Sequence, residues 1–410
     1  MDLYTLPTPY PDETWYSIVS RYHRKSGNTK STITSRELFG GTITSQKKVN
    51  PLALDNTIVD YVRLHGPTIG TAEECFSKYT LAPYQMRYYS EKRKEEVLER
   101  IFDASELKKT FVFTNHMYSR KQTMLRYCPL CLQEDIEKYG EAYWHRAHQI
   151  WVMDKCHKHG CNLLDADMSL SKATYHFTCA DEISCPNDKV TYNESPFDSF
   201  TQYAFAALNA PFSFHCDADV DALIYAAVDR GYGKFYSRGF MCDAHKMHED
   251  IQKKFGEEFI KKFFTADNGG ATIRRVFRPN WNSRVEPAIL VATFLQAPIE
   301  KLFDKIDRDA EVKEELLKCS THNVWWPKKN LARHLGIKMS RLDLMAKELN
   351  IKPFWEESPK ADDMVSFKAS FYFTEKEMKA INAKVKSLHM ASKKDFFAYC
   401  VKKEVGLVEE

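Results

Sequence analysis

The spacing of hydrophobic residues along the chain predicts a mainly helical protein. Near the start, four large apolar residues recur at intervals of three and four, so they share one face of a helix. These residues are Trp15, Ile18, Val19 and Tyr22. Asp12 is a suitable N-cap for this helix, which should run to about Lys25, and Gly27 can end it.

Further short helices are expected along the first 305 residues. Thr71 and Glu74 have the spacing of a capping box, and residues 92–102 form another helical pattern. Residues 41–68 show no such pattern, and we expect them to be irregular. Between residues 200 and 264 two helical stripes recur. They contain Phe200, Tyr203, Ala204, Ala207 and Leu208, then Val220, Leu223, Ile224 and Val228.

Residues 320–357 have the spacing of a helix-turn-helix unit. Leu331 and Leu335 line one short helix, Gly336 makes the turn, and Ser340 with Asp343 forms a capping box for a second helix. The outward side of that presumed recognition helix would carry Lys338, Arg341 and Lys347 as DNA contacts. An ordinary helical hairpin gives the same spacing, so this alternative stays open.

The pattern of residues 364–408 predicts a small C-terminal arm, with a strand followed by two helices. Apolar and polar residues alternate between Val365 and Phe373, which is typical of a half-buried strand, and Thr374 can cap the next helix. The order resembles that of ribbon-helix-helix repressors, whose paired strands enter the major groove. The candidate DNA contacts are Lys368, Ser370 and Tyr372.

A single exposed strand is only marginally stable, so this arm needs a second strand. A second copy of the chain could supply it, which would make the arm a site of self-association. A strand elsewhere in the same chain could also supply it. The alternative to a DNA-binding arm is a small capping subdomain.

Two close pairs of metal-binding residues form the strongest local motif. Cys128 and Cys131 are a C-x-x-C pair, and Cys156 and His159 are a C-x-x-H pair. Two such pairs, joined by a loop long enough to fold back, suit a four-coordinate structural Zn²⁺ with no open position for water. Free thiols and a surface histidine are the alternative.

Three further cysteines are candidates for a second metal site. Cys161, Cys179 and Cys185 follow the first site closely, which makes them its candidate ligands. However, Cys179 and Cys185 are separated by five residues and not by the two of a standard knuckle. Structural cysteines without a metal are the alternative.

Composition indicates an ordinary globular protein. The chain has 410 residues, of which 43% are hydrophobic and 28% charged, and this length allows two to four domains. No apolar run reaches a membrane-spanning length of about 20 residues, and the N-terminus lacks a signal-peptide layout. Eleven cysteines, several of them in metal-binding spacings, point to the reducing cytoplasm.

The net charge of +3 is unevenly distributed. Residues 1–131 and 326–410 each carry +5, whereas the stretch between them carries −7. Basic ends are typical of nucleic-acid contacts, although solvated surface charge explains them equally well. No phosphate-binding loop, H-E-x-x-H helix or nuclease carboxylate spacing is present, so we expect no enzyme.

The cysteine region resembles the TniQ/TnsD family over about forty residues. The resemblance is carried by RYCPLC from Arg126, by YWHR from Tyr143 with His148 and Gln149, and by CHKH from Cys156. It extends from about residue 5 to 305 through PTPYPDETWYSIVSRYHRKSGN and several later helical segments. The resemblance implies a TniQ-like domain at 1–125, a zinc module at 126–195 and a helical TnsD-like domain at 196–310.

The resemblance implies a selector of transposon insertion sites. Such a protein would bind double-stranded DNA at an attachment site and recruit an AAA+ ATPase of the TnsC type, and through it the transposase. The alternative within the family is an adapter that links an RNA-guided CRISPR complex to that ATPase. A zinc-dependent hydrolase is a third hypothesis, which a completely filled metal site disfavours.

Overall fold

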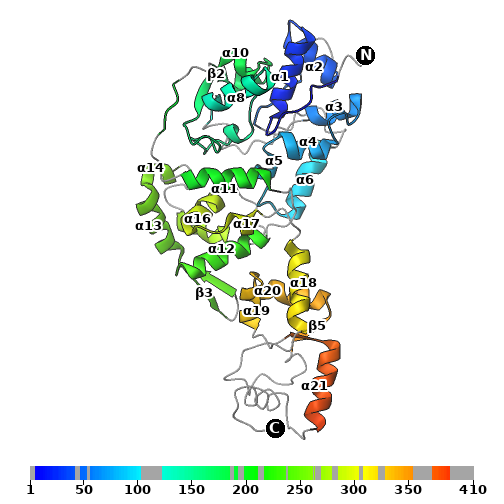
Figure 1. Ribbon diagram of the computed structural model, residues 1–410, viewed down its shortest axis with the longest axis vertical. Helices are drawn as coiled ribbons and strands as arrows, with labels where there is room; N and C mark the ends of the chain where they lie inside the picture. The colour runs from blue at the N-terminus through cyan, green and yellow to red at the C-terminus, as the bar shows by residue number, and fades with distance from the viewer. Residues whose placement is uncertain are drawn as a thin grey trace. The chain divides into compact units, whose positions relative to one another are not determined.

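The structure is a computed structural model, and its mainly helical character confirms the expected fold class (Figure 1). It describes residues 5–41, 47–52, 56–102, 122–184, 189–192, 198–210, 217–236, 239–261, 263, 269–278, 285–303, 308–321, 328–353 and 372–387. The chain divides into two compact units. The first unit comprises residues 1–232 and 242–305, and the second comprises residues 233–241 and 306–410.

The described part of the first unit is built from short helices and one small antiparallel sheet. Up to residue 184 its helices are α1 (Trp15–Ser26), α2 (Ser31–Phe39), α3 (Thr57–His65), α4 (Ala72–Tyr79), α5 (Ala82–Gln85), α6 (Glu91–Phe102), α8 (Pro129–Tyr139), the 3-10 helix η2 (Ala147–Gln149), α9 (Leu170–Ala173) and α10 (Ala180–Ile183). Its strands are β1 (Met124–Tyr127) and β2 (Leu164–Ser169). The later helices are α11 (Asp198–Asn209), α12 (Asp217–Asp229), α13 (Ala244–Phe255), α14 (Glu257–Ile260), α15 (Gly269–Val276), α16 (Glu286–Leu295) and α17 (Ile299–Leu302).

Helix α1 confirms the expected apolar face but begins later than expected. Its four apolar residues are at most 5% exposed, and Gly27 ends the helix in a left-handed conformation with φ +71°. The N-cap is Thr14, whose hydroxyl accepts a hydrogen bond from the Ser17 N–H at 3.1 Å. Asp12 is not the cap, because its carboxylate instead accepts hydrogen bonds from Arg146 Nε at 3.1 Å and from the Ala147 N–H at 3.0 Å.

The capping box of Thr71 and Glu74 is confirmed at the start of α4. The expectation of an irregular segment at 41–68 is wrong in part, because residues 57–65 form α3. Ile58 and Val59 of this helix are buried beside α2 and α4. One hydrophobic core joins residues from Leu6 to Ala180, including α1 and both strands of the sheet. The expected domain boundary at residue 125 therefore falls inside a shared core.

Within the described residues, the second unit contains four helices and two two-stranded ribbons, one of β3 with β4 and one of β5 with β6. Its elements are β3 (Gly233–Tyr236), most of β4 (Gly239–Cys242), α18 (Arg308–Thr321), α19 (Lys328–His334), α20 (Met339–Glu348), β5 (Ile351–Pro353), β6 (Tyr372–Thr374) and α21 (Glu375–Ser387). Its core consists mainly of aliphatic residues from α18, α19 and α20, such as Leu316, Leu331 and Leu342.

The helix-turn-helix spacing of the second unit gives two helices joined by a tight turn. Gly336 takes φ +66°, and the Ile337 N–H donates to the Ala332 carbonyl at 3.0 Å. The expected capping box is wrong, because α20 begins at Met339 after Lys338 and Ser340 already lies inside the first turn. A basic residue thus precedes the helix where a capping oxygen was expected.

The second strand of the C-terminal arm lies within the same chain. β6 pairs antiparallel with β5, with Tyr372 opposite Pro353 and Thr374 opposite Ile351. Of the two alternatives for a partner strand, the structure therefore contains the one inside the chain. The expected helix after Thr374 is α21, whereas Lys368 and Ser370 lie outside the described residues.

No helix within the described ranges combines the length and apolar character needed to cross a membrane.

Candidate metal centre

The pairing of β1 with β2 brings the two cysteine turns together. Tyr127 lies opposite Leu164 and Arg126 lies opposite Asp165 in an antiparallel register. Cys128 directly follows Tyr127, and the second turn ends just before Leu164. A short sheet therefore places two turns, distant in sequence, on either side of one point.

The first turn is also the start of helix α8. Cys128 is its N-cap, Pro129 occupies the first helical turn, and the Cys128 Sγ accepts a hydrogen bond from the Cys131 N–H at 3.4 Å. Proline suits this position because its fixed φ is helical and its missing N–H is not needed there. The local turn thereby directs the Cys128 and Cys131 sulfurs toward the same side.

The second turn is a tight reversal between Cys156 and Cys161. The Gly160 N–H donates to the Cys156 carbonyl at 2.9 Å, and the Cys156 N–H donates to the Cys161 carbonyl at 2.8 Å. Gly160 takes φ +67°, a conformation that glycine adopts without steric cost. This reversal carries Cys156 and His159 back toward the first turn.

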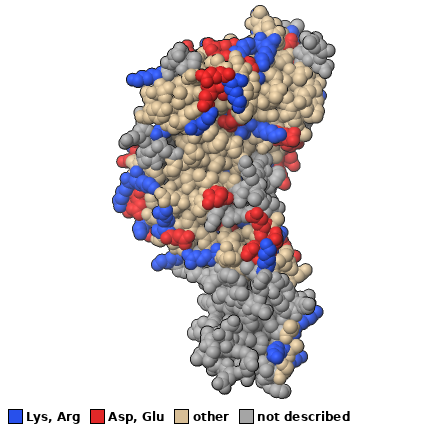
Figure 2. All heavy atoms as spheres, viewed as in Figure 1, with Lys and Arg blue, Asp and Glu red and all other residues tan. Residues whose placement is uncertain are grey.

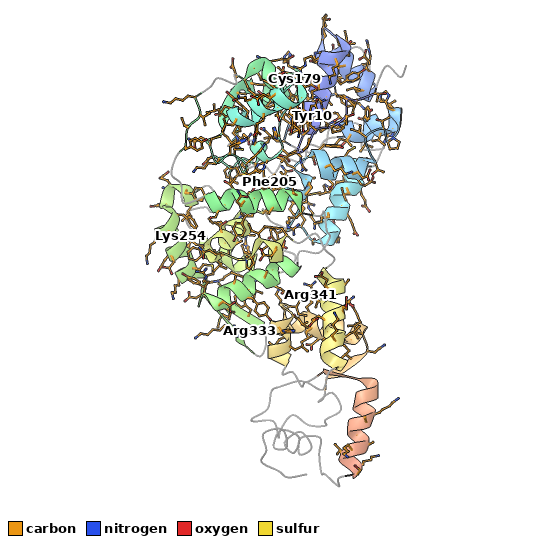
Figure 3. All side chains as sticks on the ribbon, viewed as in Figure 1. Tyr10, Cys179, Phe205, Lys254, Arg333 and Arg341 are labelled. Atoms are coloured by element: carbon orange, nitrogen blue, oxygen red, sulfur yellow. The ribbon has the colours of Figure 1, made fainter. Side chains whose placement is uncertain are left out.

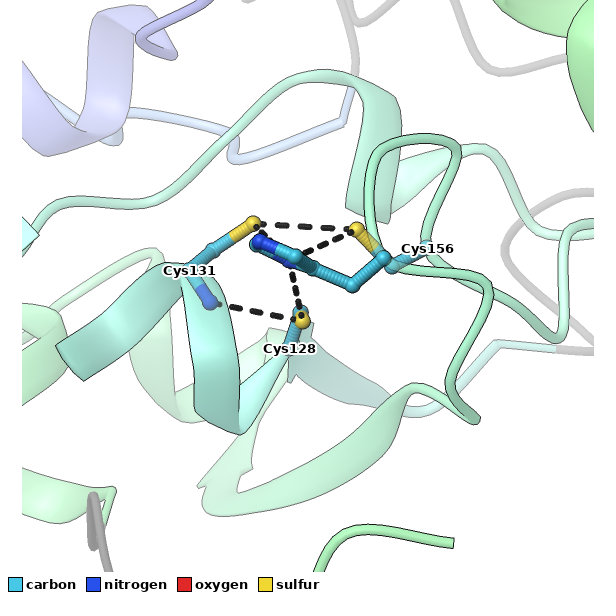
Figure 4. A group of neighbouring side chains, drawn as sticks. Cys128, Cys131 and Cys156 are labelled. Carbon is cyan, nitrogen blue, oxygen red and sulfur yellow. Dashed lines mark hydrogen bonds between the residues drawn. The ribbon is translucent and has the colours of Figure 1, made fainter. Parts of the chain in front are cut away.

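Four side chains meet at this point with the dimensions of a tetrahedral site (Figure 4). The His159 Nδ1 lies 3.4 Å from Cys128 Sγ, 3.3 Å from Cys131 Sγ and 3.7 Å from Cys156 Sγ. The sulfurs of Cys131 and Cys156 are 3.6 Å apart. Ideal tetrahedral zinc bonds would separate two sulfurs by about 3.8 Å and a nitrogen and a sulfur by about 3.5 Å. This buried Cys₃His cluster could therefore hold a metal ion.

The sequence motif omitted a carboxylate that supports the histidine. Glu134 Oε1 lies 3.1 Å from His159 Nε2, which leaves Nδ1 directed at the three sulfurs. Histidines that bind metals usually make such a hydrogen bond through the other ring nitrogen, and the bond fixes their orientation. Glu134 follows Cys131 by three residues on α8, so helical spacing was the available signal.

Glu134 also contacts the Lys158 ammonium group. This hydrogen bond, together with the one to His159, lowers the pKa of the Glu134 carboxyl. An ionised Glu134 is the better acceptor for His159 Nε2–H. Lys158 therefore contributes indirectly, through Glu134, to the orientation of the His159 ring.

The sulfurs are close enough to change one another's protonation. Hydrogen bonds from the Cys128 and Cys131 thiols lower the pKa of the Cys156 thiol. The corresponding bonds to Cys128 and Cys156 raise the pKa of Cys131. One thiolate therefore forms readily, and a cation at the centre favours ionisation of the other two thiols.

Cys161 lies beside this cluster. Its Sγ is 3.3 Å from Cys128 Sγ, and its side chain is fully buried. Cys179 is buried as the N-cap of α10 and belongs to no group of possible metal ligands among the described residues. Cys185 lies outside the described residues, so the second metal site stays a prediction.

Other residues of the YWHR motif connect the cluster region to α1. The Trp144 N–H donates to Ser17 Oγ at 3.0 Å, and the Trp144 carbonyl accepts from the Thr14 N–H at 2.9 Å. His145 Nε2 pairs with Asp135 Oδ2 at 2.8 Å. These contacts fix the fold around the cluster.

Some of the candidate DNA-contacting residues of the second unit lie within the described residues. Lys347 is exposed on α20, whereas Lys338 and Arg341 are half-buried and each has a contact within the protein. Arg341 and the exposed Arg333 come from α20 and α19 (Figure 3). Tyr372 begins strand β6.

Comparison with known proteins locates the family resemblance. Residues 5–163 match the model of the TniQ family. A 261-residue region is 22% identical to the transposon Tn7 transposition protein TnsD of Escherichia coli, and it covers 62% of this chain and 50% of that protein. The matched region thus spans about half the length of that relative. Residues 5–163, which include both metal-site turns, therefore form a region similar to the TniQ family.

Proposed function

We propose that the protein is a DNA-binding selector of target sites for transposition. The similarity to a transposition protein named TnsD, which extends well beyond the TniQ domain, carries this proposal. The helix-turn-helix order of α19 and α20 supports it, because this order serves to place a helix in the major groove. The chain would recruit an AAA+ ATPase of the TnsC type and leave the chemistry to the transposase.

The cluster of Cys128, Cys131, Cys156 and His159 would bind Zn²⁺ in a structural role. Three thiolates and one imidazole nitrogen complete a tetrahedral shell, so no position remains for a substrate or an activated water. The ion would join β1, α8 and the second turn. Its proposed contribution is to the stability of the TniQ domain.

The second unit would read DNA mainly through α20. The proposed contacts are Lys338, Arg341 and Lys347, with Lys368, Ser370 and Tyr372 of the C-terminal arm. α20 packs its Leu342 and Met345 against α18 and α19, which leaves its opposite side to face the groove. In this proposal the helix-turn-helix at residues 320–357 is the main source of sequence specificity.

The test uses the full zinc-loaded chain. Duplexes that the protein enriches from a random pool are compared with scrambled duplexes across a salt series. A selector should prefer its site by about a thousandfold or more. Lys347→Ala should then weaken binding by about 1–3 kcal/mol if the side chain reaches a base edge. Lys318→Ala, an exposed cation on α18, is the matched control.

Equal affinity for enriched and scrambled duplexes at every salt concentration would contradict direct site selection. This result would favour the alternative of an adapter that depends on an RNA-guided CRISPR complex for its target. A pull-down with that complex would then replace duplex binding as the decisive measurement.

A further inference from the structure

Helix α15 of the first unit presents a continuous face of arginines. Gly269, Gly270, Ile273 and Val276 are buried against its neighbours α13 and α16. The exposed positions recur at intervals of three and four residues, so they share the opposite face. They are Ala271, Arg274, Arg275 and, just beyond the helix, Arg278.

The three guanidinium groups lack an acidic partner among the described residues. No ion pair joins Arg274, Arg275 or Arg278 to a carboxylate of this part of the chain. Like charges three and four residues apart destabilise an isolated helix. Carboxylates of the described residues therefore do not neutralise the positive charge of this face.

The start of α15 lies close to α13. A Cβ built on Gly269 would lie 2.0 Å from His248 Nε2, and one on Gly270 would lie 3.5 Å from His245 Cε1. Both histidines belong to α13. The absence of a side chain at Gly269 thus lets the start of α15 lie against His248 of α13, whereas a Cβ at Gly270 would make only ordinary van der Waals contact.

The neighbouring helix α13 adds positive charge at its exposed end. Lys253 and Lys254 occupy its last turn, and Lys and Arg side chains are visible along the edge of the molecule formed by α13 (Figures 2 and 3). Lys253 lies 3.6 Å from Asp250, so its charge is partly balanced.

The exposed face of α20 has a different composition. It includes Asp343 and the 62% exposed Leu344 beside Lys347. Its neighbour Glu348 pairs with Lys313 at 2.7 Å. A mixed face of this kind suits selective contacts, whereas a face of arginines suits a uniformly charged partner.

We propose that Arg274, Arg275 and Arg278 bind the phosphate backbone of duplex DNA, as a contact separate from α20. Guanidinium groups match phosphate oxygens with paired hydrogen bonds, and a DNA strand offers these oxygens at regular, close intervals. The small Ala271 leaves room for a backbone to approach. This inference rests on the proposed function, because it assigns part of the same DNA contact.

The experiment compares two charge-matched triple variants of the full zinc-loaded chain. One is Arg274→Gln, Arg275→Gln and Arg278→Gln. The control is Lys30→Gln, Lys78→Gln and Lys172→Gln, which removes three exposed positive charges elsewhere in the first unit. Zinc content and circular dichroism establish that both variants are folded, and fluorescence anisotropy measures duplex affinity from low to high salt.

The arginine variant should bind enriched and scrambled duplexes about tenfold or more weakly than the control, because phosphate contacts carry no sequence information. The slope of log affinity against log salt should become shallower by about two to three units, since each phosphate contact contributes about 0.9. The ratio between enriched and scrambled duplexes should stay unchanged.

Two results would overturn the inference, and they differ in scope. If the wild type binds duplexes and both triple variants behave alike, the α15 face has another ligand, such as an acidic protein, and the proposed selector function survives. If the wild type binds no duplex at any salt concentration, both the inference and the proposed DNA-binding function fail.

Discussion

The two compact units use charge in opposite ways. In the first unit, Arg21 is 2% exposed and its guanidinium bonds Glu13 at 2.8 Å and Glu141 at 2.9 Å. In the second unit, the pair Lys313–Glu348 lies near the surface, and the small core beneath it is aliphatic. Among the described residues, charge is thus part of the interior of the first unit and a surface feature of the second.

This difference indicates where each unit obtains its stability. Surface ion pairs contribute little, so the second unit depends on burying its apolar residues. The first unit has a larger core, but it also contains buried charges and a cluster of thiols that require their partners. Its fold should therefore fail when a single partner is removed.

Loss of the metal ligands should have the largest effect. Cys131→Ser removes one of the four proposed zinc ligands, and structural zinc contributes about 10 kcal/mol or more to folding. We expect insoluble protein or loss of the first unit's structure, measured by zinc content and circular dichroism.

Cys161→Ser is the matched control, because Cys161 is buried beside the cluster but lies outside the proposed ligand set. Retained zinc in this variant would support His159 as the fourth ligand. Loss of zinc from Cys161→Ser with retention in His159→Ala would instead identify a four-cysteine site. A metal-free wild type that keeps its structure in chelator would refute the zinc proposal.

Breaking the buried ion pair should have the next largest effect. Arg21→Met leaves the carboxylates of Glu13 and Glu141 without their buried partner, which should cost about 3–5 kcal/mol. Denaturant unfolding followed by tryptophan fluorescence would measure it. Adding Glu13→Gln should recover part of the loss. A single variant as stable as the wild type would show that the pair does not stabilise the first unit.

Leu342→Ala should destabilise the second unit by about 2–5 kcal/mol, because a fully buried leucine is lost from a small core. Hydrogen exchange should accelerate in residues 308–353, and zinc content should stay unchanged. Equal acceleration in residues 124–169 would mean that the two units unfold together.

Glu13 should make the first unit sensitive to pH. Burial raises the pKa of its carboxyl from 4.5 to about 7, although Arg21 acts in the opposite direction. The folded protein therefore holds a proton that the unfolded chain releases. The contribution to stability is fully present below about pH 4.5 and is lost as pH rises through about 7, with an upper limit of about 3 kcal/mol.

The measurement is the unfolding free energy of the wild type minus that of Glu13→Gln between pH 4.5 and 8. Zinc loss in acid affects both proteins and largely cancels in this difference. The wild type should become less stable relative to the variant as pH rises. A difference that does not change with pH would contradict the raised pKa.

The smallest effect concerns helix caps. Thr14→Ala removes an observed cap of α1 and should cost about 1 kcal/mol. Ser340→Ala should change stability by less than about 0.5 kcal/mol, because Ser340 is exposed and does not cap α20. Thermal unfolding would compare them, and a larger loss at Ser340 would restore the cap expected from the sequence.

The sequence by itself determined the features that depend on local spacing. The apolar face of α1, the capping box of α4 and the two ligand pairs were all predictable, because residues three or four apart meet within one helix or turn. The family resemblance added that the two cysteine turns belong to a longer, mainly helical protein.

The tertiary structure decided which partner each polar residue has. Asp12 had the chemistry of a cap but binds Arg146, which is distant in sequence, and the chain alone gave no means to choose. Likewise, the arginines of α15 could be assigned to a free surface only once α13 and α16 covered the opposite side. Periodicity shows which residues share a face of a helix, but long-range packing decides which face is buried.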